Sequence, residues 1–149
     1  MDNAGGLNKL YYVDGDDFIS AVEGDDGLFE IALEEGAVLH EIEFTEDTGR
    51  ISESEEMTYN GLIHNFEITC KIRKCGPSNS DLFGDLCEKK LILLARDNND
   101  NNWLVGDPGT YFNITTGKDT GANFADLNNI QLKISAQLAQ PAKFTSSVL

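Results

Sequence analysis

Residues 62–73 read LIHNFEITCKIR, in which two kinds of side chain alternate from one residue to the next. The side chains on the expected buried face are His64, Phe66, Ile68, Cys70 and Ile72. A period of two is typical of a β-strand with one face in the core and one face in water. Asn60-Gly61 stands immediately before this stretch, and this dipeptide favours a tight hairpin turn. The stretch therefore predicts a long, half-buried strand with an antiparallel neighbour.

The same alternation recurs at residues 29–34, 38–44 and 130–135. Each of these stretches is separated from its neighbours by residues that favour turns, such as Glu35-Gly36. We expect three further strands from this pattern. The side chains expected to point inward are Phe29, Ile31, Leu33, Val38, Ile42, Phe44, Ile130, Leu132 and Ile134.

Residues 91–96 form a continuous apolar run and predict another strand. The turn-forming residues Asp97–Asn102 follow it, and Trp103–Gly106 is its expected hairpin partner. A short strand is expected at residues 111–114, followed by a loop rich in Gly, Asp and Thr at residues 116–123.

Helical spacing interrupts the β pattern once. Ser78–Asp81 has the S-x-x-D form of a capping box, and Leu82, Phe83 and Leu86 recur at helical spacing. We predict a helix of about three turns from about Ser80 to Lys90. The expected fold class is mainly β: an antiparallel β-sandwich or partly closed barrel with one short α-helix, in a single domain over residues 1–149.

Charge is distributed unevenly along the chain. Residues 1–60 contain 17 of the 26 acidic side chains, with Lys9 and Arg50 as their bases, and the net charge is -15. The remaining residues balance nine acids against nine bases. A one-signed field repels polyanions, which argues against affinity for nucleic acid. It favours a cationic partner, an inert anionic lining, or a solvated face without a function.

Composition narrows the cellular context. The first residues lack a secretory leader pattern, and no apolar run reaches the roughly 18 residues that a membrane span needs. We expect a soluble protein made in the cytosol. Cys70, Cys75 and Cys87 have spacings that match no redox or zinc template, so we expect free thiols, mostly buried.

Catalytic signals are weak. His40 and His64 each fall on the apolar face of an expected strand, which is typical of core histidines rather than of general bases. Neither a nucleophile elbow, nor a zinc-protease motif, nor a phosphate-cradling glycine loop is present. We therefore expect no enzyme activity and assign no catalytic residue and no cofactor.

Calcium has three candidate loops: Asp14–Asp17, Gly24–Gly27 and Asp97–Asn102. The last begins like an EF-hand loop, but Asn102 stands where glycine is needed and Pro108 stands where the bidentate glutamate belongs. That motif fails. The first two loops leave weak calcium binding open beside the simpler interpretation as turns, and we assign no metal ligand.

A small basic cluster interrupts the acidic composition. It consists of Lys71, Arg73 and Lys74, with Lys89 and Lys90 further along. Three neighbouring bases in a domain of this net charge supply little counterion-release affinity for DNA. We interpret them as the cationic half of a contact with the acidic half of a neighbouring copy.

A distinctive order of features runs from Glu43 onward and covers about two thirds of the chain. It consists of a polar strand pair (51–59 and 62–72), a short helix, the run 91–99, the segment 102–106, and the run 116–132. This order resembles a family of virion proteins from phages and prophages of Bacteroidetes hosts, related in fold to phage tail-tube and neck-ring proteins. The acidic, aromatic segment Leu10–Asp26 matches the family pattern poorly, and residues 1–27 are interpreted as an extended arm or an added strand.

The resemblance implies a structural subunit of a phage neck or tail ring that lines the DNA channel. The implied partners are further copies in a closed ring, a hexamer or a dodecamer, and adjacent portal, neck or tail proteins, with DNA passing through without specific binding. The implied location is the virion, with the protein made in the host cytoplasm and no membrane involved. The alternative is a monomeric carbohydrate- or calcium-binding β-sandwich module, for which the expected stacking residues are Tyr11, Tyr12, Trp103 and Tyr111.

Overall fold

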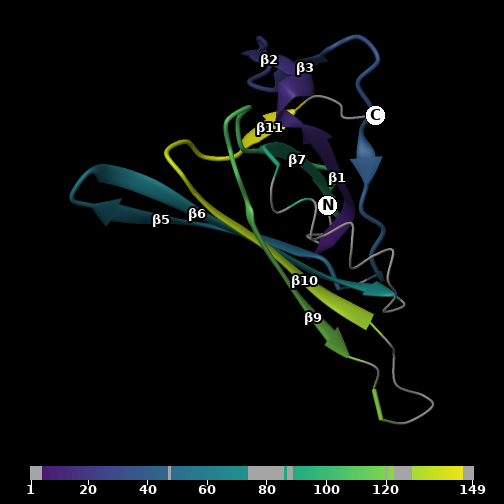
Figure 1. Cartoon of the computed structure of the whole chain (residues 1–149). Helices are drawn as coiled ribbons and strands as arrows, with labels where there is room; N and C mark the ends of the chain where they lie inside the picture. The colour runs from purple at the N-terminus through teal and green to yellow at the C-terminus, as the bar shows by residue number, and fades with distance from the viewer. Residues whose placement is uncertain are drawn as a thin grey trace.

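A computed structural model describes residues 5–46, 48–73, 86, 89–119, 121–122 and 129–145. The described chain forms two β-sheets (Figure 1). The elements are β1 (Leu7–Asp14), the 3-10 helix η1 (Gly15–Asp17), β2 (Phe18–Glu23), β3 (Phe29–Leu33), β4 (His40–Glu41), β5 (Arg50–Thr58), β6 (Gly61–Arg73), β7 (Leu91–Asp97), β8 (Asn102–Val105), β9 (Asn113–Asp119), β10 (Asn129–Leu138) and β11 (Lys143–Thr145).

The larger sheet has seven strands in the order β2-β3-β11-β8-β7-β1-β4. Its pairings are antiparallel except for a single parallel contact between β11 and β3. The smaller sheet has four antiparallel strands in the order β5-β6-β10-β9. The predicted mainly β fold with antiparallel pairing is confirmed, and the two sheets do not close into one barrel over the described residues.

One apolar cluster lies between the two sheets and joins them. The four-stranded sheet contributes the inward residues of β6 and β10, and the seven-stranded sheet contributes residues of β1, β7 and β8. Each large side chain removed from water here stabilises the fold by about 1.5–3 kcal/mol. Representative members are Leu10, Phe66, Ile68, Leu93, Val105, Ile130, Leu132 and Ile134.

The alternation in residues 62–73 is confirmed as β6, a strand of thirteen residues. Its pairing with β10 runs from Arg73 opposite Asn129 to His64 opposite Leu138, so the buried faces of the two strands coincide. The β5–β6 hairpin forms where the Asn-Gly dipeptide predicts a turn, but its two loop residues are Tyr59 and Asn60, and Gly61 is already paired with Thr58 as the first residue of β6. Gly61 has a φ of 116°, which a residue with a side chain adopts only at a cost.

The continuous apolar run in residues 91–96 becomes β7, which is buried on both faces. Leu91, Leu93 and Ala95 belong to the core between the sheets. Ile92 and Leu94 belong to a second apolar cluster on the opposite face, here named the outer cluster, with partly buried side chains of β2 and β3 packed against it. A strand covered on both faces has no position for a polar side chain, which explains the unbroken run.

Three predicted elements differ in the structure. The strand expected at residues 38–44 is reduced to β4, two residues long, and Val38 is 58% exposed instead of pointing inward. The loop expected at residues 116–123 begins later, because β9 continues through Asp119 in register with β10. Tyr111 makes an isolated bridge to Lys90 and stands outside the strand. Pairing with a long neighbour, which local composition does not reveal, accounts for the extension of β9.

The predicted helix from about Ser80 to Lys90 lies mostly outside the described residues. Leu86, which falls within it, is helical and 3% exposed, and it contacts the core between the sheets. Lys89 and Lys90 are exposed.

Candidate functional site

The two histidines lie in different sheets and are not brought together. His40 in β4 is exposed and stacks on the ring of Tyr12, with centroids 4.9 Å apart. Its predicted core position is therefore wrong, because β4 is the edge strand of its sheet. His64 in β6 is 4% exposed, and its predicted core position is confirmed.

His64 faces two carboxylates of the neighbouring strand β5. Its Nδ1 lies 3.3 Å from Oε1 of Glu53 and 3.9 Å from Oε1 of Glu55. The two glutamates are on the inner face of the hairpin, opposite Phe66 and His64 in the strand register. Over the described ranges, no group of three or more His, Cys, Asp or Glu side chains is arranged to hold a metal ion.

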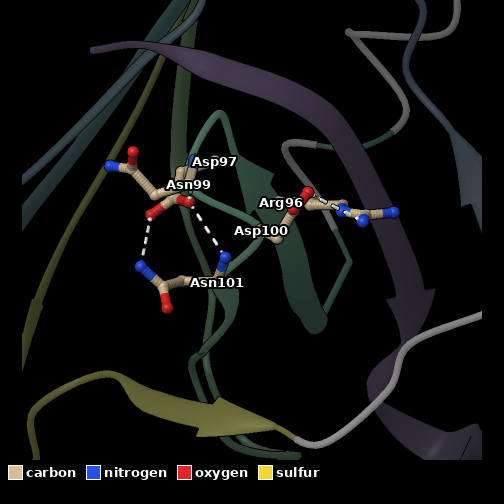
Figure 2. A network of polar contacts seen from close by, with 5 residues as sticks. All are labelled: Arg96, Asp97, Asn99, Asp100 and Asn101. Atoms are coloured by element: carbon tan, nitrogen blue, oxygen red, sulfur yellow. Dashed lines mark hydrogen bonds and ion pairs between the residues drawn. The ribbon is translucent and has the colours of Figure 1, made fainter. Parts of the chain in front are cut away.

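The Asp97–Asn102 loop is a hairpin turn organised around the Asp97 carboxylate (Figure 2). One oxygen accepts from the backbone N–H groups of Asn99 and Asn101, both at 2.9 Å. The other accepts from the Asn101 side chain at 3.2 Å and from the Trp103 indole N–H at 3.0 Å. Both oxygens are thus directed at N–H donors of the turn, which is the role of a turn acceptor rather than of a cation ligand.

These hydrogen bonds also set the protonation of Asp97. Its partial burial acts to raise the pKa, but the hydrogen bonds from Trp103 and Asn101 outweigh burial and hold the pKa below its ordinary value. Asp100, which has a φ of 64°, pairs with Arg96 at 2.8 Å across the same turn (Figure 2).

The other two candidate calcium loops are also turns with internal acceptors. The Asp14 side chain caps η1 by accepting from the backbone N–H of Asp16 at 3.2 Å. The Asp26 side chain accepts from the backbone N–H of Leu28 at 3.0 Å, beside Gly27 with its φ of 80°. Such side chain to backbone bonds are the usual reason for Asp in turns.

The four aromatic residues expected to stack on a ligand do not share one surface. Tyr11 is 8% exposed and belongs to the outer cluster, whereas Tyr12 packs against the core between the sheets. Trp103 is partly buried and packs edge-on against Phe144, with centroids 4.8 Å apart. Tyr111 is 58% exposed and lies under the ammonium group of Lys90.

Cys70 is a free, buried thiol on the inner face of β6, and burial raises its pKa to about 12. Its thiolate is therefore scarce at neutral pH, which makes it a poor nucleophile. Cys75 and Cys87 lie outside the described residues.

The exposed acids of residues 5–46 are together named here the acidic surface. They lie on η1, on β2, β3 and β4, and on the connections after these strands, and β2 and β4 are the two edge strands of the larger sheet. Lys9 is the base of this segment, and it pairs with Glu41 at 3.2 Å. The exposed members are Asp16, Glu23, Asp25, Asp26, Glu30, Glu34, Glu35, Glu41, Glu43 and Glu46.

The second charged surface lies on the smaller sheet, on the face that points away from the core. We name this the open face, and we name its four bases, Arg50, Lys71, Arg73 and Lys133, the basic patch. Arg50 lies opposite Thr69, and Thr69 lies opposite Lys133, so the strand register brings these bases together. Glu67 pairs with Lys133 at 3.6 Å.

Sequence reasoning found only part of this patch. Lys71 and Arg73 were predicted as a cluster, and both are exposed. Lys74 lies outside the described residues, and Lys90 lies over Tyr111 instead. Arg50 and Lys133 were missed because they come from other strands, although Lys133 occupies a polar-face position in the alternation of residues 130–135.

No protein-family model matches the chain, and the searches of curated proteins and of solved structures gave no match. Among the helical residues that are described, no segment has the length and apolar character to cross a membrane.

Proposed function

We propose that this protein is a structural subunit of a bacteriophage neck or tail ring, and that copies of it enclose the DNA channel. The observation that carries the proposal is the acidic surface: its carboxylates are exposed, and its base, Lys9, is already paired with Glu41. DNA has to slide through such a ring without sticking. A surface with many acids and few free bases repels phosphate and adds no counterion-release affinity.

The architecture supports assembly into a ring. In the four-stranded sheet, β5 and β9 each have one strand neighbour among the described residues, so both edges are open to pairing. The two edges differ in sequence, and contact between two different surfaces is head-to-tail, the kind that closes into rings when the rotation suits. The partners are further copies, as a hexamer or a dodecamer, and the adjacent portal, neck or tail proteins of a virion.

A second feature supports contact with other subunits. The tip of the β5–β6 hairpin carries Met57, 75% exposed, and Tyr59, which is fully exposed. In Figure 1 this tip extends beyond the end of β10, away from the rest of the molecule. Large apolar side chains on a projecting hairpin are expected where a neighbouring protein covers them.

The test is the oligomeric state of the purified protein. We expect native mass spectrometry to show one defined closed species, and electron microscopy of the same sample to show rings with a central pore. Charge-driven contacts weaken with salt, so the measurement should be repeated at about 0.05 M and about 0.5 M salt. A strict monomer at every protein concentration, with saturable calcium or glycan binding, would support the monomeric module instead.

A further inference from the structure

The basic patch is concentrated at one end of the open face. Arg50, Thr69 and Lys133 form one cross-strand row of the four-stranded sheet. Lys71 and Arg73 follow at the next two outward positions of β6. Toward the hairpin tip, the charged residues on the open face of β5 and β6 are acids: Glu67, at the next outward position after Thr69, and Glu56 near the tip. Over β5 and β6, the open face thus changes from basic to acidic along the strands.

A hollow of about 390 Å³ lies within this basic end. Its lining includes Lys71, Lys133, Gln131 and Thr115. Gly117 of β9 forms part of it, and a side chain there would meet open space. Ammonium, amide and hydroxyl groups around a depression suit an anionic, convex partner.

Among the side chains that the structure describes, most bases of the basic patch have no ion-pair partner. Lys133 has Glu67 at 3.6 Å. The ion pairs found among the described side chains do not involve Arg50, Lys71 or Arg73. At these three bases an anionic partner would therefore gain interactions without displacing one of those ion pairs.

The same chain presents a convex acidic feature at the turn between β2 and β3. Glu23, Asp25, Asp26 and Glu30 are all exposed around it, and we name this group the acidic turn. The turn has a defined shape, because Gly24 donates to the Leu28 carbonyl at 2.8 Å and accepts from Gly27 at 3.1 Å.

The acidic turn and the hollow lie at opposite ends of the molecule. In Figure 1 the β2–β3 hairpin is at the top, whereas the end of β6 and the start of β10 are at the lower right. One copy cannot bring the two together. Two copies can, and the resulting contact leaves an unused turn on one copy and an unused hollow on the other.

We propose that the acidic turn of one copy docks in the basic hollow of the next, and that this is a head-to-tail contact of the assembly. The proposal rests on the proposed function as a ring subunit and names the surfaces through which the ring closes. Opposite charges across the contact set its orientation and accelerate association. The docked turn also covers bases that would otherwise attract DNA to the ring.

The test is a charge-swap experiment on the full chain. One variant carries Arg50→Glu and Lys71→Glu, and the other carries Glu23→Lys and Asp25→Lys. Among the described residues, these four side chains make no hydrogen bond or ion pair that holds the fold, and thermal melts check that both variants are folded. Control variants each reverse one charge of the same sign elsewhere, which is half the change in net charge of a double variant: Lys118→Glu on the other face of the sheet and Glu35→Lys at the far end of the β2–β3 hairpin.

We expect each double variant to lower the association constant by at least about tenfold, measured by sedimentation velocity, while the controls assemble like the unaltered protein. An equimolar mixture of the two variants should assemble again, because every contact in an alternating ring then joins opposite charges. Rings that form equally well with either variant alone would overturn this contact and leave the proposed function intact. Failure of the unaltered protein to assemble would overturn both.

One further outcome would overturn the proposal by showing that DNA, rather than the acidic turn, binds in the hollow. If the unaltered protein binds a short DNA duplex in a gel shift, and Arg50→Glu with Lys71→Glu abolishes that binding, the hollow is a nucleic-acid site. The controls distinguish this from a general change in net charge, since Lys118→Glu alters the charge without altering the hollow.

Discussion

The strands β7 and β6 are both internal strands of their sheets, but they differ in what covers them. β7 is buried on both faces over Leu91–Ala95, while β6 is buried on one face and open to water on the other. Their sequences differ accordingly, one a continuous apolar run and the other an alternation. The comparison teaches that the larger sheet stabilises the fold through both of its faces, whereas the smaller sheet keeps one face available for contacts.

The largest expected effect tests the double burial of β7. Leu94, 1% exposed, packs in the outer cluster beneath β2 and β3. Leu94→Ala should lower the free energy of unfolding by about 2–5 kcal/mol, measured by urea denaturation, because it leaves a cavity. The matched change Asn65→Ala on the open face of β6 should cost less than about 0.5 kcal/mol. Equal costs at the two positions would contradict the contrast between the strands.

The second prediction concerns the turn at the end of β7. Asp97→Ala leaves the Trp103 indole N–H and two backbone N–H groups without their acceptor, and we expect a loss of about 1–3 kcal/mol. Exposed Asp100→Asn, which breaks only the ion pair with Arg96, should cost less than about 1 kcal/mol.

Asp97 also predicts a dependence of stability on pH. Its pKa is lower in the folded state than the unfolded value of about 3.9, so the carboxylate stabilises the fold above that value. The contribution is lost as the pH falls through the folded-state pKa. Asp97→Asn removes this titration, and its melting temperature should therefore fall less than that of the unaltered protein between about pH 5 and about pH 2.5. If the melting temperatures of the two proteins fall equally over this pH range, Asp97 is not the group whose titration lowers the stability.

The third prediction concerns the turn at the start of β6. Gly61→Ala places a side chain at a φ of 116°, and we expect a loss of about 1 kcal/mol or more in thermal or urea unfolding. Gly117→Ala is the matched control, since Gly117 has no positive φ and open space at its Cβ. If Gly61→Ala leaves the stability to unfolding unchanged, the hairpin turn adopts another backbone conformation without cost.

The smallest expected effect concerns the open face of β6 and its basic patch. We expect no measurable binding of double-stranded DNA at about 0.15 M salt, because the net charge of -15 repels phosphate at close range. Fluorescence anisotropy with a labelled duplex at micromolar protein checks this. Binding that weakens with added salt would show that the basic patch overcomes the field of the acidic surface.

The sequence predicted the strands whose own side chains carry the signal. The alternation in residues 62–73 and 130–135 identified the buried faces of β6 and β10, because burial of one face leaves a period of two in the chain itself. The run at residues 91–96 predicted β7, and Asn60-Gly61 predicted the hairpin turn. The alternation in residues 38–44 predicted a strand with Val38 pointing inward, and this prediction was wrong because β4 pairs with β1 over only two residues.

The sequence by itself determined which residues of β6 and β10 point inward and that the acids gather in the first part of the chain. Only the tertiary structure decided that β1 pairs with β7 across a long stretch of sequence, that β2 and β3 cover the outer face of β7, and that Arg50 joins Lys71 and Lys133 in one patch. The physical reason is that periodicity depends on a residue's own burial, which is local. The partner that buries it is set by the register of distant strands, where cross-strand neighbours are chosen by the packing of the whole core.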